Sequence, residues 1–328
     1  MSRLIHTTTF RQSGVGLVEL MVALVLGLFV TAGVTSMFVQ NKGSYNQDER
    51  NARMQENARY ALQLLARDLS MAGFWGGVVS SGADITDPGS GTLQITADCG
   101  VSGVRWAFNP TQAMQYVRSG DAPNTEFACI EAGTYKTGTS ALSIKHVAGV
   151  STTSPESGHV YVRTVGASGN LINSDGTATP TGLQDWQYVV NIYYIATDAN
   201  GIPWLRRKYL TKNGTQPTIQ DEGQLAEGIE QFHIQFGIDT DGDGIPNQYL
   251  SNPTDTQLQT AVSARIYVLV RSSDQDFSSP PNDKIYTLGD LAVNGGNAFN
   301  DRFYRRVYTT TVQLRNTQYQ LILQGATT

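Results

Sequence analysis

The chain has 328 residues, 40% of them hydrophobic, which is enough for one large domain or two small ones. Its formal net charge of −5 excludes the basic field that a nucleic-acid partner would require. Only 16% of the residues are charged, whereas glycine occurs 33 times and tyrosine 15 times. This composition is typical of a sheet-rich, loop-rich surface protein rather than of a cytosolic helical enzyme.

The first predicted element is an apolar helix near the N-terminus. Residues 1–14 are polar, with Arg3 and Arg11 and no acid, and residues 15–39 carry one charge, Glu19. At about 1.5 Å per residue, this run extends roughly 37 Å as a helix, enough to cross a hydrocarbon core. The run is longer than an ordinary secretory signal and no small-residue cleavage site follows it. Because arginines stay on the cytoplasmic side, we expect a single-pass inner-membrane protein with a periplasmic head.

Glu19 is the anomaly of this run, because a carboxylate in a membrane span costs a few kcal/mol. Either it sits at the level of the lipid headgroups and is tolerated there, or it has a partner. Its context, "SGVGLVELMVAL", resembles the class III signal of type IV pilins and pseudopilins, in which a dedicated peptidase cuts after a glycine. In that family a glutamate occupies the fifth position after the cut, as Glu19 does here.

The resemblance implies that a prepilin peptidase removes the leader, residues 1–14, by cutting after Gly14. Val15 then becomes the N-terminus, which the family methylates, and Glu19 neutralises the amine of a neighbouring subunit in the filament. Either charge left alone in an apolar bundle would cost several kcal/mol, so the pair would set the axial register. The sequence departs from the family at Val15, where phenylalanine is usual, and at Gly16, where a hydroxyl residue is usual.

The same helix is expected to continue to the boundary of a head domain. Its second half has an apolar stripe at spacings of three and four residues, and Gly73 follows as a terminator, so we expect the helix to cover residues 15–73. An ordinary amphipathic helix of a soluble domain would explain the second half equally well, but not the first. The stripe consists of Met54, Ala58, Ala61, Leu65, Leu69 and Ala72, while Glu56, Arg59, Arg67 and Asp68 lie off it.

Residues 74–328 are expected to form a periplasmic β-rich head, so that the fold class is α+β with a long N-terminal helix packed on a pilin-like sheet domain. Short runs rich in Val, Ile, Tyr and Thr alternate there with clusters of turn residues. Long loops are expected in segments 80–130 and 150–185. The predicted strands are "TLQIT", "SALSIKHV", "HVYVRTV", "YVVNIYYIA", "PWLRRKYL", "IEQFHIQFGI", "VSARIYVLVRSS" and "RRVYTTTVQLRN".

The only two cysteines, Cys99 and Cys129, fall in this head. In an oxidising periplasm we expect them to form one disulfide, which closes a loop of about 30 residues and stabilises the fold by roughly 3–4 kcal/mol in the chain-entropy model. The alternative is a pair of free buried thiols.

The stretch "DTDGDGIPN" predicts a calcium loop. Asp239, Asp241 and Asp243 occupy alternate positions, and the Ile245 carbonyl and Asn247 follow at the spacing of further oxygen ligands. Such hard donors suit Ca²⁺, although the glutamate expected at the twelfth position of a helical calcium loop is Leu250 here. We therefore expect a weakly binding loop between strands, completed by Asp255 or a backbone carbonyl. The alternative is an acidic turn that holds no metal.

The C-terminal stretches "QFHIQFGIDTDGDG", "ARIYVLVRSS" and "YRRVYTTTVQLRN", together with "ENARYALQLLARDLSMAGFWG", resemble minor pilins of the PilW type. The resemblance implies a protein that co-assembles with other minor pilins and the major pilin to prime the type IV pilus, at or near its tip, with a large tip adhesin as a further partner. One alternative is the J-type pseudopilin of type II secretion. Another is a tip adhesive or binding module, which exposed Trp106 or Trp186 would favour.

No catalytic signature was found in the sequence, so we expect no enzyme. There is no G-x-S-x-G, phosphate loop or H-E-x-x-H. The histidines His6, His146, His159 and His233 form no metal pair at helical spacing, and two of them lie in predicted strands, where a packed histidine is the common outcome.

Overall fold

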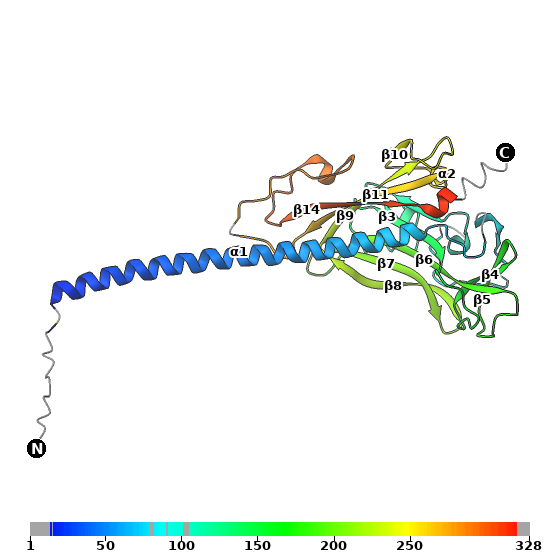
Figure 1. The fold of residues 1–328 in the computed structure, drawn as a ribbon, viewed down its shortest axis with the longest axis horizontal. Helices are drawn as coiled ribbons and strands as arrows, with labels where there is room; N and C mark the ends of the chain where they lie inside the picture. The colour runs from blue at the N-terminus through cyan, green and yellow to red at the C-terminus, as the bar shows by residue number, and fades with distance from the viewer. Residues whose placement is uncertain are drawn as a thin grey trace, which may run out of the picture. The chain divides into compact units, whose positions relative to one another are not determined.

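The computed structural model describes residues 14, 16–78, 82–89, 91–100, 105–277 and 279–319. The chain divides into two compact units, residues 1–52 and residues 53–328. Helix α1 (Leu17–Met71) supplies the described helix of the first unit and continues into the second (Figure 1). The prediction of a long N-terminal apolar helix followed by a strand-rich head is confirmed.

In the first unit every described residue from Leu17 to Glu49 is exposed, including large apolar side chains such as Leu17, Phe29 and Phe38. Among the described residues, α1 is the one helix whose length and composition would allow it to cross a membrane. An apolar surface of this extent is not stable in water, so this part of α1 requires a lipid or protein environment.

In the second unit the last turns of α1 bury the stripe that the sequence predicts. Ala58, Ala61, Leu65 and Leu69 are fully buried. The helix ends at Met71, and Gly73 follows in the left-handed region at φ 71°, the conformation that a helix-terminating glycine adopts.

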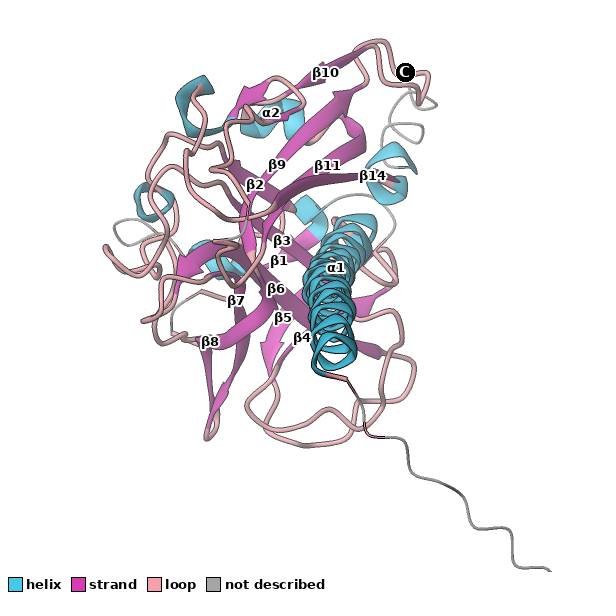
Figure 2. Ribbon diagram, turned by 90° about the vertical axis from the view of Figure 1, so that its left-hand side faces the viewer, coloured by secondary structure: helices cyan, strands magenta, loops and turns pink. Residues whose placement is uncertain are grey.

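The strands of the second unit form two main sheets (Figure 2). The larger, eight-stranded sheet has the order β1-β5-β4-β6-β3-β2, and a long β7–β8 hairpin extends from β6; the smaller sheet has the order β10-β9-β11-β14. The pairing within both is antiparallel except between β1 and β5.

Short helical turns and strands make up the chain after α1. The 3-10 turns are η1 (Gly82–Asp84), η2 (Trp106–Phe108), η3 (Pro123–Thr125) and η4 (Val293–Gly296), and a short helix is α2 (Asp255–Leu258). The strands are β1 (Ile85–Thr86), β2 (Met114–Val117), β3 (Ala141–Val147), β4 (Val160–Val165), β5 (Ser168–Asn173), β6 (Gln184–Thr197), β7 (Pro203–Asn213), β8 (Gln216–Glu227), β9 (Ile229–Ile238), β10 (Gln248–Leu250), β11 (Ala261–Arg271), β12 (Thr287–Leu288), β13 (Leu291–Ala292) and β14 (Arg305–Gln313).

The apolar core lies on both faces of the larger sheet. On β6, Tyr193 and Ile195 pack in the cluster that contains the α1 stripe. Their neighbours Ile192 and Tyr194 belong to a second cluster, which also holds Cys99. Because successive side chains of a strand point to opposite faces, β6 is covered on both sides, which explains its nearly continuous apolar run.

Several strand predictions need correction. The strands β1, β2 and β5, which lie in segments expected to be long loops, were not predicted, and neither were the short strands β10, β12 and β13. "TLQIT" is not a strand, since only Thr96 forms an isolated bridge, to Thr218. Strand β8 was missed because its sequence, "QPTIQDEGQLAE", is polar. Its pairing follows from the β7–β8 hairpin, in which Asn213 pairs with Gln216 around Gly214 at φ 62°. The dipeptide Asn213–Gly214 is a hairpin signal that would have located it.

Asp68 is a further correction, because the helical periodicity places it off the buried stripe. Its side chain is 9% exposed and accepts hydrogen bonds from Asn191 Nδ2 at 2.6 Å and from the Tyr193 hydroxyl at 2.5 Å. Both donors lie on β6, so this carboxylate connects α1 to the larger sheet. Burial, together with the Asp68 charge, raises the pKa of Tyr193 well above its usual value, so the tyrosine remains a donor.

Candidate functional site

The processing and assembly residues lie at the start of the described chain. Gly14 is exposed, Val15 and the leader residues before Gly14 lie outside the described residues, and α1 begins two positions after Val15. Glu19 stands in the first helical turn, where a negative charge is favoured by the helix dipole. Within the described part of the chain no hydrogen bond or ion pair involves its carboxylate. The partner expected for Glu19 would therefore come from another molecule.

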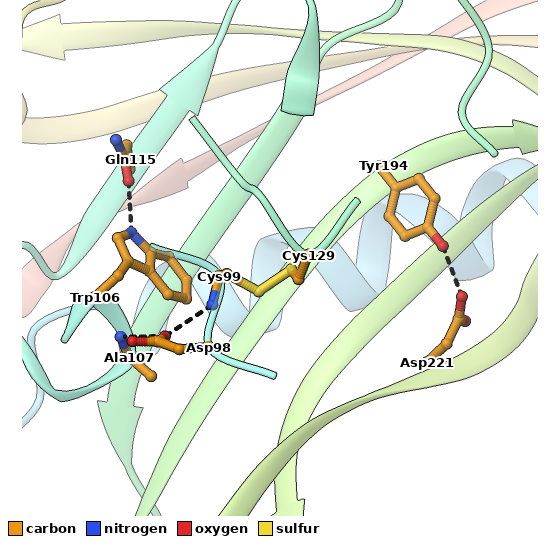
Figure 3. Close-up of a disulfide and its surroundings, with 8 residues drawn as sticks. All are labelled: Asp98, Cys99, Trp106, Ala107, Gln115, Cys129, Tyr194 and Asp221. Carbon is orange, nitrogen blue, oxygen red and sulfur yellow. Dashed lines mark hydrogen bonds between the residues drawn. A yellow bond between two sulfur atoms is a disulfide. The ribbon is translucent and has the colours of Figure 1, made fainter. Parts of the chain in front are cut away.

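Cys99 and Cys129 are joined by a disulfide, with their Cα atoms 4.5 Å apart (Figure 3). Beside the bridge, Asp98 Oδ1 accepts hydrogen bonds from the backbone N–H of Cys99 at 2.8 Å and of Ala107 at 3.1 Å. The bridge therefore holds the irregular segments around Cys99 and Cys129 against the face of the larger sheet that carries Ile192 and Tyr194.

The aspartate loop connects β9 to β10, which are antiparallel neighbours, so its flanks are strands as the sequence predicts. One oxygen from each of Asp239, Asp241 and Asp243 lies within 4.8 Å of the others. The structure thus brings together the three carboxylates that spacing selected. Asp255 is not among them: its Oδ2 accepts a hydrogen bond from Gln112.

Backbone hydrogen bonds already shape this loop. Asp239 Oδ1 accepts from the N–H of Gly242 at 2.7 Å and Oδ2 from that of Gly244 at 2.7 Å. Desolvation alone would raise the pKa of the Asp239 carboxyl, but these bonds outweigh it and lower the pKa. The side-chain oxygen of Asn247 accepts from Thr240 N at 2.7 Å, so it does not point freely at the carboxylates. The carboxylates fit a cation; Asn247 would have to turn to join them.

A second polar cluster, which sequence reasoning missed, surrounds Arg305 on β14. Its guanidinium donates to Glu230 at 2.5 Å through Nε and to Asp301 at 2.6 Å through Nη1. Lys136 Nζ lies 3.2 Å from Glu230. Burial alone would raise the pKa of Glu230, yet the bonds from Arg305 and the charge of Lys136 lower it. The cluster fixes β14 and β9 to the loops that flank them.

His233, Ser251 and Asp290 lie together but are not arranged as a catalytic triad. Both Ser251 Oγ, at 3.2 Å, and Asp290 Oδ1, at 3.0 Å, approach the same ring atom, His233 Nε2. Nucleophilic catalysis needs the serine on one ring nitrogen and the carboxylate on the other. Here Tyr116 occupies Nδ1 at 3.0 Å, so the cluster holds the β12–β13 hairpin, which contains Asp290, against β9.

The tryptophans that would favour a binding module are not exposed platforms. Trp106 is 4% exposed and donates to Gln115 at 2.8 Å (Figure 3). Trp186 is half-buried and meets Phe74 edge-on at 6.0 Å between ring centroids. Both therefore serve packing.

Lys145 on β3 is a fully buried lysine. Its Nζ donates to the carbonyl oxygens of Trp106 at 2.6 Å and Asn109 at 3.1 Å, and lies 4.1 Å from the centroid of the Trp106 ring. Desolvation lowers the pKa of Lys145 to about 7.

Substituting Lys145 is expected to change the pH dependence of stability. An unfolded lysine has a pKa of about 10.4, so between pH 7 and pH 10 the unfolded state binds the proton and the folded state does not. The free energy of unfolding then rises with pH by up to about 1.4 kcal/mol per pH unit. Lys145→Met should remove this slope in urea titrations at pH 7.5, 8.5 and 9.5, whereas Lys284→Met, at an exposed site, should keep it. Equal slopes in the two variants would contradict the assignment.

Comparisons with known proteins agree with the sequence patterns at both ends of the chain. The family described as Type IV Pilus-assembly protein W matches residues 192–316, which contain β9, β11 and β14. The prokaryotic N-terminal methylation motif matches residues 9–35, which contain Gly14 and Glu19. These two matches confirm the resemblance to PilW-type proteins and to the class III signal, and the first of them spans less than half of the chain.

Among solved structures, the chain is similar to a type IV-like pilin from Thermus thermophilus, with 12% sequence identity and a TM-score of 0.35. The similarity covers 81% of this chain and 98% of that one. At this score it carries no argument about function. None of the curated proteins matches the chain.

Proposed function

We propose that this chain, with its type IV pilus-assembly protein W region and its N-terminal methylation motif, is a minor pilin that primes pilus assembly from the inner membrane. The observation that carries the proposal is the junction of two parts: an exposed apolar helix bearing one early carboxylate, and a closely packed, strand-rich head. Other minor pilins, the major pilin and a tip adhesin are the partners, and a position at or near the tip follows from a priming role.

The mechanism is structural. The helix lies in the bilayer with the arginine-bearing leader in the cytoplasm and the head in the periplasm. Prepilin peptidase cuts after Gly14, and the new amine of Val15 and the carboxylate of Glu19 become available to neighbouring subunits. In the apolar filament interior, each charge is then neutralised by its counterpart, which fixes how far one subunit advances along the next.

Deleting the gene tests the pilus assignment against the alternative of a secretion pseudopilin. If the protein primes pili, deletion of its gene should abolish surface pili and twitching motility and leave the secreted enzymes unchanged. Loss of secretion with normal pili would instead establish the J-type alternative, and a deletion without effect on pili would reject the proposal.

Substituting Gly14 is expected to block processing. A Cβ at Gly14 or at Gly16 meets no atom within 4 Å, so alanine at either position should leave the fold intact. Gly14→Ala should retain the leader and Gly16→Ala should lose it, as the intact mass of each protein would show. A Gly14→Ala protein of mature mass would place the cleavage elsewhere.

For the aspartate loop we propose a weak Ca²⁺ site, which would order this part of the head for contact with another surface. The support is the meeting of Asp239, Asp241 and Asp243, together with the exposed Ile245 at the same turn. Three carboxylates at this separation repel one another, and a divalent cation offsets the repulsion. Calcium would supply only charge neutralisation and rigidity here.

Calcium is therefore expected to raise the melting temperature of the full chain in detergent. At ten times a millimolar Kd the stabilisation is about 1.4 kcal/mol, or roughly 2–3 °C for a unit of this size. Asp241→Asn should abolish the rise, and Asp283→Asn, an exposed acid outside the loop, should not. The absence of any shift in the unaltered protein would show that the loop is an acidic turn.

A further inference from the structure

Strand β14 (Arg305–Gln313) forms an open edge of the smaller sheet. It pairs with β11 over nine consecutive residue pairs without a register shift, and none of the other described strands lies on its second side (Figure 2). A regular strand edge exposes a row of backbone donors and acceptors to which another strand can bond.

The register shows which groups are open. Leu314 N donates to Val262 O, in the register that pairs Gln313 with Ser263. In an antiparallel ladder every second residue bonds to the same neighbour, so the even-numbered residues of β14 bond to β11. The odd-numbered residues therefore direct their N–H and C=O groups to the open side. They are Val307, Thr309, Thr311 and Gln313. The described part of the chain provides no backbone hydrogen-bond partner for them on the open side.

The other long edge, β8 in the larger sheet, is protected in ways that β14 is not. Its pairing with β7 shifts register at two points, and Gly223 bends it at φ 91°. Bulges of this kind prevent edge-to-edge association. Strand β14 has no bulge, glycine or proline, and three successive threonines favour extended backbone.

Room for another strand exists beside the C-terminal part of this edge. A groove of about 760 Å³ is lined by Thr311 and Gln313 of β14, by Met71 at the end of α1 and by Phe74. Gly149 also lines it, and the next residue, Val150, is 80% exposed. The groove thus combines open backbone groups with a mixed lining, apolar at Met71 and Phe74 and polar at Ser70 and Asn316, next to which an added strand can lie.

Charge indicates the kind of strand that fits. Residues 302–319 contain no Asp or Glu, and Arg306 and Arg315 are exposed near the two ends of β14. Within the described part of the chain neither arginine has an ion-pair partner. Two copies paired antiparallel through this edge would bring the Arg306 end of one near the Arg315 end of the other, and like charges would repel.

We propose that the β14 edge binds an extended, carboxylate-bearing strand of a different pilin subunit, which continues the smaller sheet across the subunit boundary. This rests on the proposed function for the identity of the partner as a pilin. The backbone bonds would supply affinity, and the terminal arginines would select an acidic strand over a second copy of this chain.

The test is photocrosslinking in piliated cells, with a photoreactive amino acid in place of Gln313 in the full-length protein. We expect an adduct with another pilin, mapped to a peptide that contains Asp or Glu. Thr309→Pro removes an N–H that points away from β11 and should reduce the adduct at least tenfold, while Thr309→Val should retain it. The charge reversals Arg306→Glu and Arg315→Glu together, which leave the backbone unchanged, should also reduce it.

Three results would overturn the proposal: an adduct that survives Thr309→Pro, an adduct formed only with a second copy, or no adduct in cells that need this protein for their pili. The proposed function fails by a different result, since deletion would then leave piliation unchanged. Melting temperatures of the Thr309→Pro and Thr309→Val proteins show whether an adduct was lost through unfolding.

Discussion

Glu19→Ala is expected to give a protein that is cut normally, accumulates in the membrane and fails to support pili. Removing the carboxylate leaves the amine of a neighbouring subunit unpaired in an apolar environment, which costs several kcal/mol. Since about 1.4 kcal/mol corresponds to a factor of ten in an equilibrium, surface pili should fall roughly tenfold or more. The measurement combines the intact mass of the protein in the membrane fraction with counts of surface pili.

Two further variants separate charge from position. Glu19→Asp keeps the charge on a shorter side chain and should retain part of the function, whereas Glu19→Gln should behave as alanine does. Glu56→Ala removes an exposed carboxylate from the second half of the same helix and should have no effect on pili. Normal piliation of the Glu19→Ala strain would show that the carboxylate is only tolerated in the span.

Glu230→Gln is expected to lower the free energy of unfolding by about 3 kcal/mol. Glu230 and Arg305 are 4% and 9% exposed, and removal of the Glu230 charge leaves Arg305 with Asp301 alone and Lys136 without its ion-pair partner, so the expected loss is at the low end for a buried pair. For a unit of this size the melting temperature should fall by roughly 5 °C. Because its folded-state pKa is lowered, the stability from the Glu230 carboxylate is present above its unfolded pKa and is lost as pH falls through the folded value.

The matched control is Glu222→Gln on β8, where the partner is Arg207 and both side chains are partly exposed. Exposed pairs contribute about 0–1 kcal/mol, so this variant should melt close to the unaltered protein. A double-mutant cycle with Arg305→Met would isolate the coupling between Glu230 and Arg305. Equal destabilisation by Glu222→Gln and Glu230→Gln would show that burial does not distinguish the two pairs.

Together these predictions separate two roles within one chain. We propose a docking role for the apolar half of α1 with Glu19, and substitutions there should leave the stability of the head unaffected. The cluster around Arg305 concerns the position of β14, and therefore the edge at which we propose strand addition. A Glu230→Gln protein that remains folded but loses the crosslink from β14 would connect the buried cluster to that surface.

Much of the fold could be predicted from local sequence patterns. The apolar stripe of α1 and the strands that alternate Val, Ile and Tyr depend on neighbours within a few residues, so periodicity identified them. Strand β8 was missed because tertiary pairing with β7 overrides its polar composition. "TLQIT" failed for the converse reason, since a strand-like composition does not supply a partner strand.

By itself, the sequence determined the apolar helix with its single early carboxylate, which is the segment that must leave water. It also determined the close spacing of Asp239, Asp241 and Asp243. Both features are set by residues adjacent along the chain. Only the tertiary structure decided that Asp68 is buried against β6, that Glu230 meets Arg305 from 75 positions away, and that β14 is left with an open edge. The physical reason is that burial, ion pairing and edge exposure depend on which distant segments the core brings together, and the local periodicity that defines each segment does not encode that choice.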